Sequence, residues 1–322
     1  MDIQSIPAAV EKTGGYKSLS YGSKLAASIK KHWEVYLMII PPLVLLILFA
    51  YWPMAGIIIS FKDYSVRRGM FASQWVGLKY YIDFVTSPAF SQLLSNTLLL
   101  SLYNLVASFP VPIILAVAIN EVNSLKFKKL VQTVTYAPYF ISTVVLVGMM
   151  MQFLDLHNGF INHIITALGG DPVNFMGTPS MFRSIYVWSG IWQTAGYSAI
   201  IYIAALASVD PSLVEAAIID GANRLQKIIN VDIPTIAPTI IILLIMAIGN
   251  MLGIGFEKVY VMQNPLNIGQ SEIISTFVYK RGLQNIQYSY ATAVGVFNSV
   301  VNLILLLAAN WSAKRAGDTT LF

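Results

Sequence analysis

Long apolar runs separated by short polar segments dominate the hydropathy pattern of this 322-residue chain. A helix that crosses a bilayer needs about 20 mostly apolar residues. Six stretches meet this requirement, and together they predict six membrane-spanning helices. They cover about residues 35–59, 92–120, 130–153, 184–208, 234–254 and 289–311. Pro110, Pro112 and Pro138 interrupt the second and third stretches and predict kinks there.

The composition supports a lipid environment for these helices. The chain is 56% hydrophobic and 11% charged, whereas a typical soluble domain carries roughly 25% charged residues. Because so few charges cannot cover the surface of a soluble protein, we expect an all-α integral membrane protein with a six-span domain over residues 35–311. The sequence has no cysteine, which excludes disulfides and thiolate metal sites.

Lysine and arginine positions predict the orientation of the helices, because short cytoplasmic loops are enriched in both. Lys126, Lys128 and Lys129 crowd the short loop between the second and third spans. This density favours a cytoplasmic N-terminus and a cytoplasmic C-terminus, with residues 312–322 as a cytoplasmic tail. We expect residues 1–34 to be a basic cytoplasmic segment. Within it, the stretch 24–33 is either a short helix on the membrane surface, as its spacing predicts, or a disordered basic tail.

A charged segment over residues 210–234 lies between the fourth and fifth spans. Asp210 can cap a helix that starts at Pro211, and Gly221 predicts a left-handed turn after it. A second short helix follows, and Pro234 is expected to end it. The segment cannot span a membrane, because each charge at a helix centre costs roughly 2.5–3.5 kcal/mol. Its apolar face either packs on the membrane domain or docks into a groove of a partner.

The charged segment resembles the EAA loop of ABC-importer permeases. The matching positions of this loop are Glu215, Ala216, Ala217, Gly221, Val231, Ile233 and Pro234. The resemblance extends over about residues 30–315 and is closest to the carbohydrate-uptake branch, which includes maltose permeases. Residues 40–65, 120–142 and 289–315 look like permeases for aldouronates, alginate and other oligo- or polysaccharides.

The resemblance implies a type I ABC importer permease fold in the bacterial cytoplasmic (inner) membrane. It implies a heterodimer with a second permease, two cytoplasmic ATPases that bind ATP and Mg²⁺, and an extracytoplasmic solute-binding protein that delivers an oligo- or polysaccharide. In this family the helix from Glu215 to Gly221 sits in a groove of the ATPase. The residues expected to couple to the ATPase are Glu215, Ala216, Ala217, Asp220, Gly221, Arg224 and Pro234.

The chain itself has no expected catalytic residue, metal site or cofactor. No phosphate-binding loop of the G-x-x-x-x-G-K-[ST] type occurs in the sequence. The energy for transport is therefore expected to come from the partner ATPases through the charged segment.

Polar and aromatic side chains inside the spans are candidates for a sugar path, because aromatic faces stack on sugar C–H groups and amides bond to hydroxyls. The candidates are Trp188, Trp192, Gln193, Tyr197, Asn250, Asn298 and Asn302. Tryptophan and tyrosine also anchor helices at the membrane surface, and the asparagines can instead bond between helices. For a carboxylated sugar, Arg183, Lys280 and Arg281 are candidate cations on the outer side.

Three other classes of protein fit the pattern less well. An ABC permease for a solute other than sugar would keep the charged segment but not the similarity in the first three spans. A secondary transporter usually has ionisable groups at the membrane midplane, and these spans have none there. An intramembrane enzyme is disfavoured because His32, His157 and His163 fall outside the middle of the spans.

Overall fold

The computed structural model describes residues 31–316. The prediction of a helix on the membrane surface over 24–33 therefore falls almost wholly outside the described residues. The chain divides into two compact units, one up to Gly56 and one from Ile57 onward. In the first unit, α2 (Trp33–Leu46) continues through the π-helical turn η1 (Ile47–Tyr51) into α3 (Trp52–Met54).

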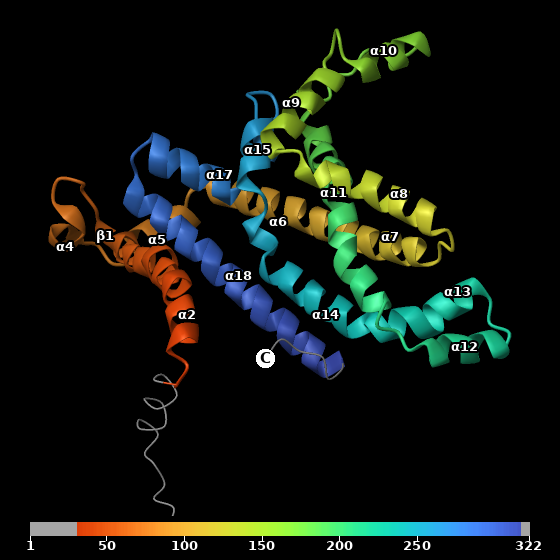
Figure 1. The fold of residues 1–322 in the computed structure, drawn as a ribbon. Helices are drawn as coiled ribbons and strands as arrows, with labels where there is room; N and C mark the ends of the chain where they lie inside the picture. The colour runs from red at the N-terminus through yellow and green to blue at the C-terminus, as the bar shows by residue number, and fades with distance from the viewer. Residues whose placement is uncertain (1–30, 317–322) are drawn as a thin grey trace, which may run out of the picture. The chain divides into compact units, whose positions relative to one another are not determined.

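The elements of the second unit are mostly helices, as Figure 1 shows. They are η2 (Ala55–Phe61, which begins in the first unit), α4 (Gly69–Ala72), α5 (Lys79–Val85), α6 (Pro88–Ser108), α7 (Pro110–Asn120), α8 (Leu125–Tyr136), η3 (Ala137–Phe140), α9 (Thr143–Phe153), α10 (Phe160–Ala167), α11 (Pro179–Leu206), α12 (Pro211–Ile219), α13 (Arg224–Lys227), η4 (Ile228–Asp232), α14 (Ile233–Gly249), η5 (Met251–Gly253), α15 (Phe256–Met262), α16 (Ile268–Ser271), α17 (Ile274–Tyr279), η6 (Lys280–Gln284) and α18 (Tyr288–Ala316). A short hairpin pairs β1 (Lys62–Asp63) with the antiparallel β2 (Gln74–Trp75).

The described helices match the six predicted spans. Four are long and apolar enough to cross a membrane, and the number rises to six if each of two bent pairs is one span. The four are Trp33–Phe61, Pro88–Asn120, Arg224–Gly249 and Tyr288–Arg315. The bent pairs are Leu125–Phe140 with Thr143–Phe153, at 98°, and Pro179–Leu206 with Pro211–Ile219, at 80°. In the second pair, α11 has the length of a span and α12 is the predicted charged helix that turns away from it.

The prolines act differently from one another. Phe109, between α6 and α7, has helical dihedral angles of φ −66° and ψ −44°. Residues 88–120 therefore form one continuous helix, which Pro110 and Pro112 do not break. Pro138 lies in η3, at the 98° bend of the third span. The prediction that Pro234 ends a short helix is wrong, because the helix runs through it into α14. The π-helical turn η4 precedes Pro234, and its wider hydrogen-bond spacing accommodates a ring that lacks an N–H.

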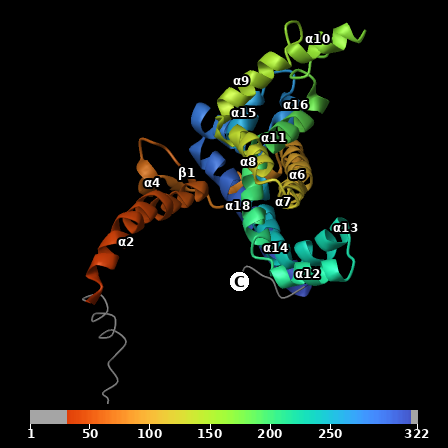
Figure 2. The same ribbon diagram turned by 45° about the vertical axis from the view of Figure 1, so that its right-hand side comes forward.

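Helix α11 lies at the centre of the second unit, where it packs against α6, α7, α8 and α14. Figure 2 shows it among these helices from a second direction. Its buried side chains include Val187 and Ile191, which join a core cluster with Leu100 of α6 and Val147 of α9. Gly196 permits the crossing with α8, since a Cβ at this position would overlap the carbonyl of Thr135. At the other end of the chain, α18 runs to Ala316 and includes the start of the predicted tail.

Candidate functional site

Helix α12 begins as the sequence predicts. The Asp210 carboxylate accepts a hydrogen bond of 2.9 Å from the backbone N–H of Ser212, and Pro211 occupies the first helical position. This bond to the charged form lowers the pKa of Asp210 below its ordinary value, and a second bond with the Ser212 hydroxyl acts in the same direction. The cap thus satisfies a backbone donor that would otherwise have no partner.

Gly221 ends α12 in the left-handed conformation that the sequence predicts, with φ at +78°. The N–H of Ala222 bonds to the carbonyl of Ala217, and the N–H of Gly221 bonds to that of Ile218. This pattern is a Schellman motif, which closes a helix through a residue without Cβ strain. Two residues later, Asn223 and Gln226 cap α13 reciprocally, with bonds of 2.8 and 2.9 Å. This capping box has a recognisable Asn-x-x-Gln spacing that the sequence analysis did not use.

The apolar side chains of α12 are exposed. Ile218 is 64% and Ile219 85% exposed, and no residue of the helix is buried. Figures 1 and 2 show α12 and α13 projecting beyond the ends of α7 and α11, and α12 lies against α13 and η4. Of its two proposed uses, packing on the membrane domain is partial, because α12 contacts η4, the turn that leads into α14, and leaves Ile218 and Ile219 uncovered. Docking with a partner stays a prediction, and Glu215 and Ala216 lie on the exposed surface that it would use.

A charged cluster joins the loop to the end of α7. Lys227 forms an ion pair with Glu121, and its ammonium lies 3.2 Å from the carboxylate of Asp232, which is 2% exposed. We call Glu121, Lys227 and Asp232 the latch. Helical spacing of 3.6 does not place residues 227 and 232 together, but the π-helical turn between them does. The partner Glu121 is distant in sequence, so the latch was missed by sequence reasoning.

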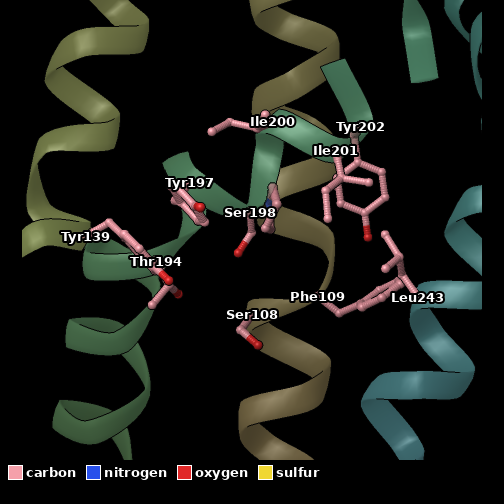
Figure 3. Close-up of a pocket in the computed structure, with 11 residues that line it drawn as sticks. Ser108, Phe109, Tyr139, Thr194, Tyr197, Ser198, Ile200, Ile201, Tyr202 and Leu243 are labelled. Atoms are coloured by element: carbon pink, nitrogen blue, oxygen red, sulfur yellow. The ribbon is translucent and has the colours of Figure 1, made fainter. Parts of the chain in front are cut away.

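A cavity of about 580 Å³ lies among α6, α7, η3, α11 and α14. Figure 3 shows Tyr139 and Tyr197 on one side of it and Tyr202 with Leu243 on the other. The rings of Tyr139 and Tyr197 are stacked, with centroids 3.8 Å apart. Hydroxyl groups and apolar side chains complete the lining, which comprises Ser108, Phe109, Pro112, Tyr139, Thr194, Tyr197, Ser198, Ile200, Ile201, Tyr202 and Leu243. Aromatic faces beside hydroxyls can contact both the C–H and the O–H groups of a sugar.

Of the predicted path residues, Tyr197 alone lines this cavity. Trp188 and Trp192 are more than half exposed on α11, and the Trp188 indole donates a 3.1 Å hydrogen bond to the hydroxyl of Tyr103. The Gln193 amide donates a 2.7 Å bond to the carbonyl of Ile141. This carbonyl lies at the bend between η3 and α9, so Gln193 satisfies a backbone group that the bend frees.

The three asparagines lie around the end of α14. Asn250 follows the last residue of that helix. From α18, Asn302 accepts a 3.0 Å bond from the N–H of Leu252, and Asn298 donates a 3.5 Å bond to the carbonyl of the same residue. Asn298 and Asn302 therefore bond between elements, as the sequence allowed, and satisfy the backbone where α14 is interrupted. Their role in a sugar path is not tested by these bonds.

The cations of the outer half differ in their partners. Lys280 pairs with Glu272 at 2.9 Å, and Arg281 lies 5.3 Å from the centre of the Phe277 ring. Arg183 bonds at 3.1 Å to the amide oxygen of Asn96, and its buried Nε has no partner.

Lys258 is a buried cation that the sequence analysis did not select. Its residue is 7% exposed, and its ammonium donates a 2.8 Å bond to the carbonyl of Tyr186. It also lies 4.8 Å from the centre of the Tyr186 ring. Within residues 31–316, neither Lys258 nor Arg183 takes part in an ion pair with a carboxylate. The outer half of α11 therefore carries one cation, Arg183, and adjoins another, Lys258, that have no ion-pair partner in the described part of the chain.

The six candidate spans, the interrupted helices and the exposed charged segment are the features of a membrane permease. Residues 108–318 match the family model described as "Binding-protein-dependent transport system inner membrane component". The chain belongs to this family. It is thus an inner-membrane permease component of an ABC importer and not itself an enzyme, and the alternatives of a secondary transporter and an intramembrane enzyme fall away.

Named relatives and solved structures agree with this assignment. The chain is 46% identical over 288 residues to the polygalacturonan/rhamnogalacturonan transport system permease protein YteP of Bacillus subtilis (strain 168), covering 89% of this chain and 90% of that protein. A chain of a bacterial ABC transporter that imports the acidic polysaccharide alginate superposes with a TM-score of 0.84 at 39% identity, covering 91% and 99%. In a bacterial alginate transporter solved with an alginate pentasaccharide-bound periplasmic protein, the TM-score is 0.85 at 38% identity, covering 92% and 100%.

Proposed function

We propose that this permease imports acidic oligo- or polysaccharides as one half of a permease heterodimer. Two cytoplasmic ATPases, which bind ATP and Mg²⁺, supply the energy, and an extracytoplasmic solute-binding protein delivers the saccharide. The observation that carries this proposal is the exposed α12, capped at Asp210, closed at Gly221 and held by the latch. Such a rigid helix outside the membrane domain transmits force from a partner to the spans.

The acidic character of the substrate is supported by two lines of argument. The similar proteins are named for the transport of polygalacturonan and of alginate. Both polysaccharides are chains of uronic acids. In addition, Arg183 and Lys258 are cations without carboxylate partners among the described residues. Taking a charge out of water is costly unless a counter-charge compensates it. A passing uronate carboxylate supplies that counter-charge, whereas a permease for neutral or cationic solutes would gain nothing from these cations.

The path for the saccharide runs along the exposed face of α11, opposite the second permease. Trp188 and Trp192 lie one turn apart on this face, with more than half of each side chain accessible in the single chain, while Tyr197 projects from another side of α11 and lines the cavity. The stacked Tyr139 and Tyr197 extend the aromatic surface into the cavity of Figure 3. Gln193, Asn298 and Asn302 act on the path through the helix breaks that they hold, and Asn250 lies beside them at the end of α14. Their direct contact with sugar is a further part of the proposal.

The test is purification in mild detergent from the native host, followed by reconstitution of what co-purifies. We expect a second permease and an ATPase, with ATP hydrolysis stimulated by one solute-binding protein loaded with oligogalacturonate or oligoalginate. The same binding protein offered a neutral maltooligosaccharide should give no stimulation. Stimulation by the neutral sugar alone would overturn the acidic substrate, and solute movement by the lone chain along an ion gradient would overturn the importer.

The role of α12 is tested with Glu215→Ala. Glu215 is exposed on the proposed docking surface, and its loss should reduce stimulated hydrolysis by about tenfold or more without lowering the amount of folded membrane protein. Glu257→Ala is the matched control, because Glu257 is also an exposed helical glutamate but lies in α15, on the outer side. Equal hydrolysis by both variants would contradict docking through α12.

A further inference from the structure

A second cavity, of about 350 Å³, opens where the first and last outer loops meet. It lies within the second unit, by β1, α5 and the start of α18, and Figure 1 shows these elements far from α12 and α13. The residues that line it are Asp63, Tyr64, Tyr80, Asp83, Ile286, Gln287, Tyr288, Ser289 and Tyr290. We call it the outer Tyr–Asp pocket. The importer mechanism described above does not use it.

The walls of the outer Tyr–Asp pocket are held by contacts between the two loops. The backbone N–H of Tyr64 donates a 2.9 Å bond to the hydroxyl of Ser289. The rings of Tyr64 and Tyr288 meet edge to face with centroids 6.0 Å apart, and those of Tyr80 and Tyr290 meet in the same way at 6.4 Å. Aromatic pairs favour this edge-to-face geometry, which stabilises the contact between the two loops. The pocket is therefore built before any ligand arrives.

The pocket carries negative charge. Asp63 and Asp83 are exposed, and neither is in an ion pair among residues 31–316. The Tyr80 hydroxyl donates a 2.8 Å bond to the Asp63 carboxylate. Burial, the hydrogen bond to Asp63 and the negative charges of Asp63 and Asp83 together raise the pKa of Tyr80 to about 12. Loss of the phenol proton is thus opposed by a negative potential as well as by desolvation.

Among residues 31–316, the cations near the pocket form no ion pair with Asp63 or Asp83. Lys62 directs its ammonium to the carbonyls of Met70 and Phe71. Lys79 lies 5.5 Å from the centre of the Tyr80 ring, without a carboxylate partner. Arg281 lies over the ring of Phe277. The two aspartates are therefore available to an incoming group.

Carboxylates between tyrosine rings bind a cationic side chain, which gains charge-assisted hydrogen bonds and cation–π contacts together. Arginine suits such a site best, because its planar guanidinium both stacks and forms paired hydrogen bonds. An acidic saccharide would be repelled by the same carboxylates. The pocket therefore favours a cationic group and not the acidic saccharide that is the proposed substrate. On the outer side of an importer, the macromolecule that must dock is the solute-binding protein that delivers this saccharide.

We propose that the outer Tyr–Asp pocket receives an arginine or lysine side chain of the solute-binding protein when it docks. This inference rests on the proposed function, since it requires that a solute-binding protein stimulates the assembled importer. It adds the place of contact and its chemistry: a basic residue on the carrier enters between Tyr80 and Tyr288 and pairs with Asp63 and Asp83. The contact is electrostatic and should govern how readily the carrier docks, not how fast the docked complex turns over.

The test is ATP hydrolysis by the reconstituted complex, measured against the concentration of the solute-binding protein that stimulates it. In Asp63→Asn/Asp83→Asn we expect the half-saturating concentration to rise about tenfold or more at low ionic strength, with an unchanged maximal rate. Added salt should weaken docking to the unmodified protein more than to the variant, because salt screens exposed charges. Asp171→Asn is the control, since Asp171 is an exposed carboxylate of another outer loop.

Asp83→Lys provides a second variant that adds repulsion and should shift half-saturation further than the neutral replacement. Unchanged half-saturation in the double variant and in Asp83→Lys would overturn the inference while leaving the importer intact. A shift in the saccharide concentration required at saturating binding protein would overturn it too, because the pocket would then bind cargo. If no solute-binding protein stimulates the unmodified complex, the proposed function itself fails.

Discussion

The ammonium of Lys227 lies 3.2 Å from the carboxylate of Asp232, a residue that is 2% exposed. The same ammonium pairs with Glu121 at the end of α7. One lysine thus connects the loop that carries α12 to a helix more than a hundred positions earlier in the chain. We predict that a displacement of α12 is transmitted through this latch to α7 and through α14 into the membrane.

Removing the lysine should uncouple the loop. In Lys227→Met the Asp232 carboxylate stays buried without its counter-charge, which costs roughly 3 kcal/mol or more for a buried pair. We expect a lower midpoint of thermal unfolding in detergent and less transport per ATP hydrolysed. Lys227→Arg keeps the charge and should retain most of both.

A second substitution separates the charge from the packing. Asp232→Asn introduced together with Lys227→Met removes the uncompensated charge and should recover part of the lost thermal stability. If the double variant is no more stable than Lys227→Met, the electrostatic account of the latch is wrong.

Gly221→Ala should weaken the turn after α12. Nothing lies within 4 Å of the added Cβ, so the effect comes from the backbone alone, which has φ at +78°. The left-handed conformation costs an L-residue roughly 1–2 kcal/mol. We expect faster amide hydrogen exchange in α12 and weaker coupling to ATP hydrolysis. Gly269→Ala, also in open space but without a positive φ, should leave both unchanged.

Gly196→Ala should disrupt the centre of the second unit. The added Cβ would overlap the backbone carbonyl of Thr135, and a backbone atom cannot move aside as a flexible side chain does. Overpacking of this kind costs roughly 1–3 kcal/mol. Size-exclusion profiles and thermal unfolding should reveal the loss, while Gly148→Ala in α9, where nothing lies within 4 Å, should behave like the unmodified protein. Equal stability of the two variants would refute the close crossing of α8 and α11.

The cap of α12 should depend on pH. The pKa of Asp210 in the folded chain is lower than its ordinary value of 3.8, so the cap contributes fully above that value and is lost as the pH falls through the folded pKa. Amide exchange of the first turn of α12, corrected for intrinsic rates, should increase in this range. Asp210→Asn keeps a capping group without titration and should remove the pH dependence, and a pH dependence that persists in Asp210→Asn would assign it to another group.

Local chemistry was sufficient to predict much of the charged segment over residues 210–234. The Asp210 cap depends on a bond two residues away, and the Gly221 turn depends on the absence of a Cβ, so both are properties of short stretches of sequence. The wrong prediction that Pro234 ends a helix also came from a local rule, since a proline normally terminates a helix. It did not here because the preceding π-helical turn changed the hydrogen-bond register, and no local pattern announces that change.

The six spans, their order and the exposed charged loop follow from the sequence alone, because hydropathy over about 20 residues and the distribution of lysine reflect transfer between water and lipid. The tertiary structure decided what the polar groups inside the membrane domain do. It assigned Gln193 to the bend at Ile141 and Asn302 to the interruption at Leu252. It also brought Glu121 to Lys227 and the two outer loops to one pocket. These relationships depend on how helices pack in three dimensions, and a hydrogen-bond partner fifty or a hundred residues away leaves no periodic signal in one sequence.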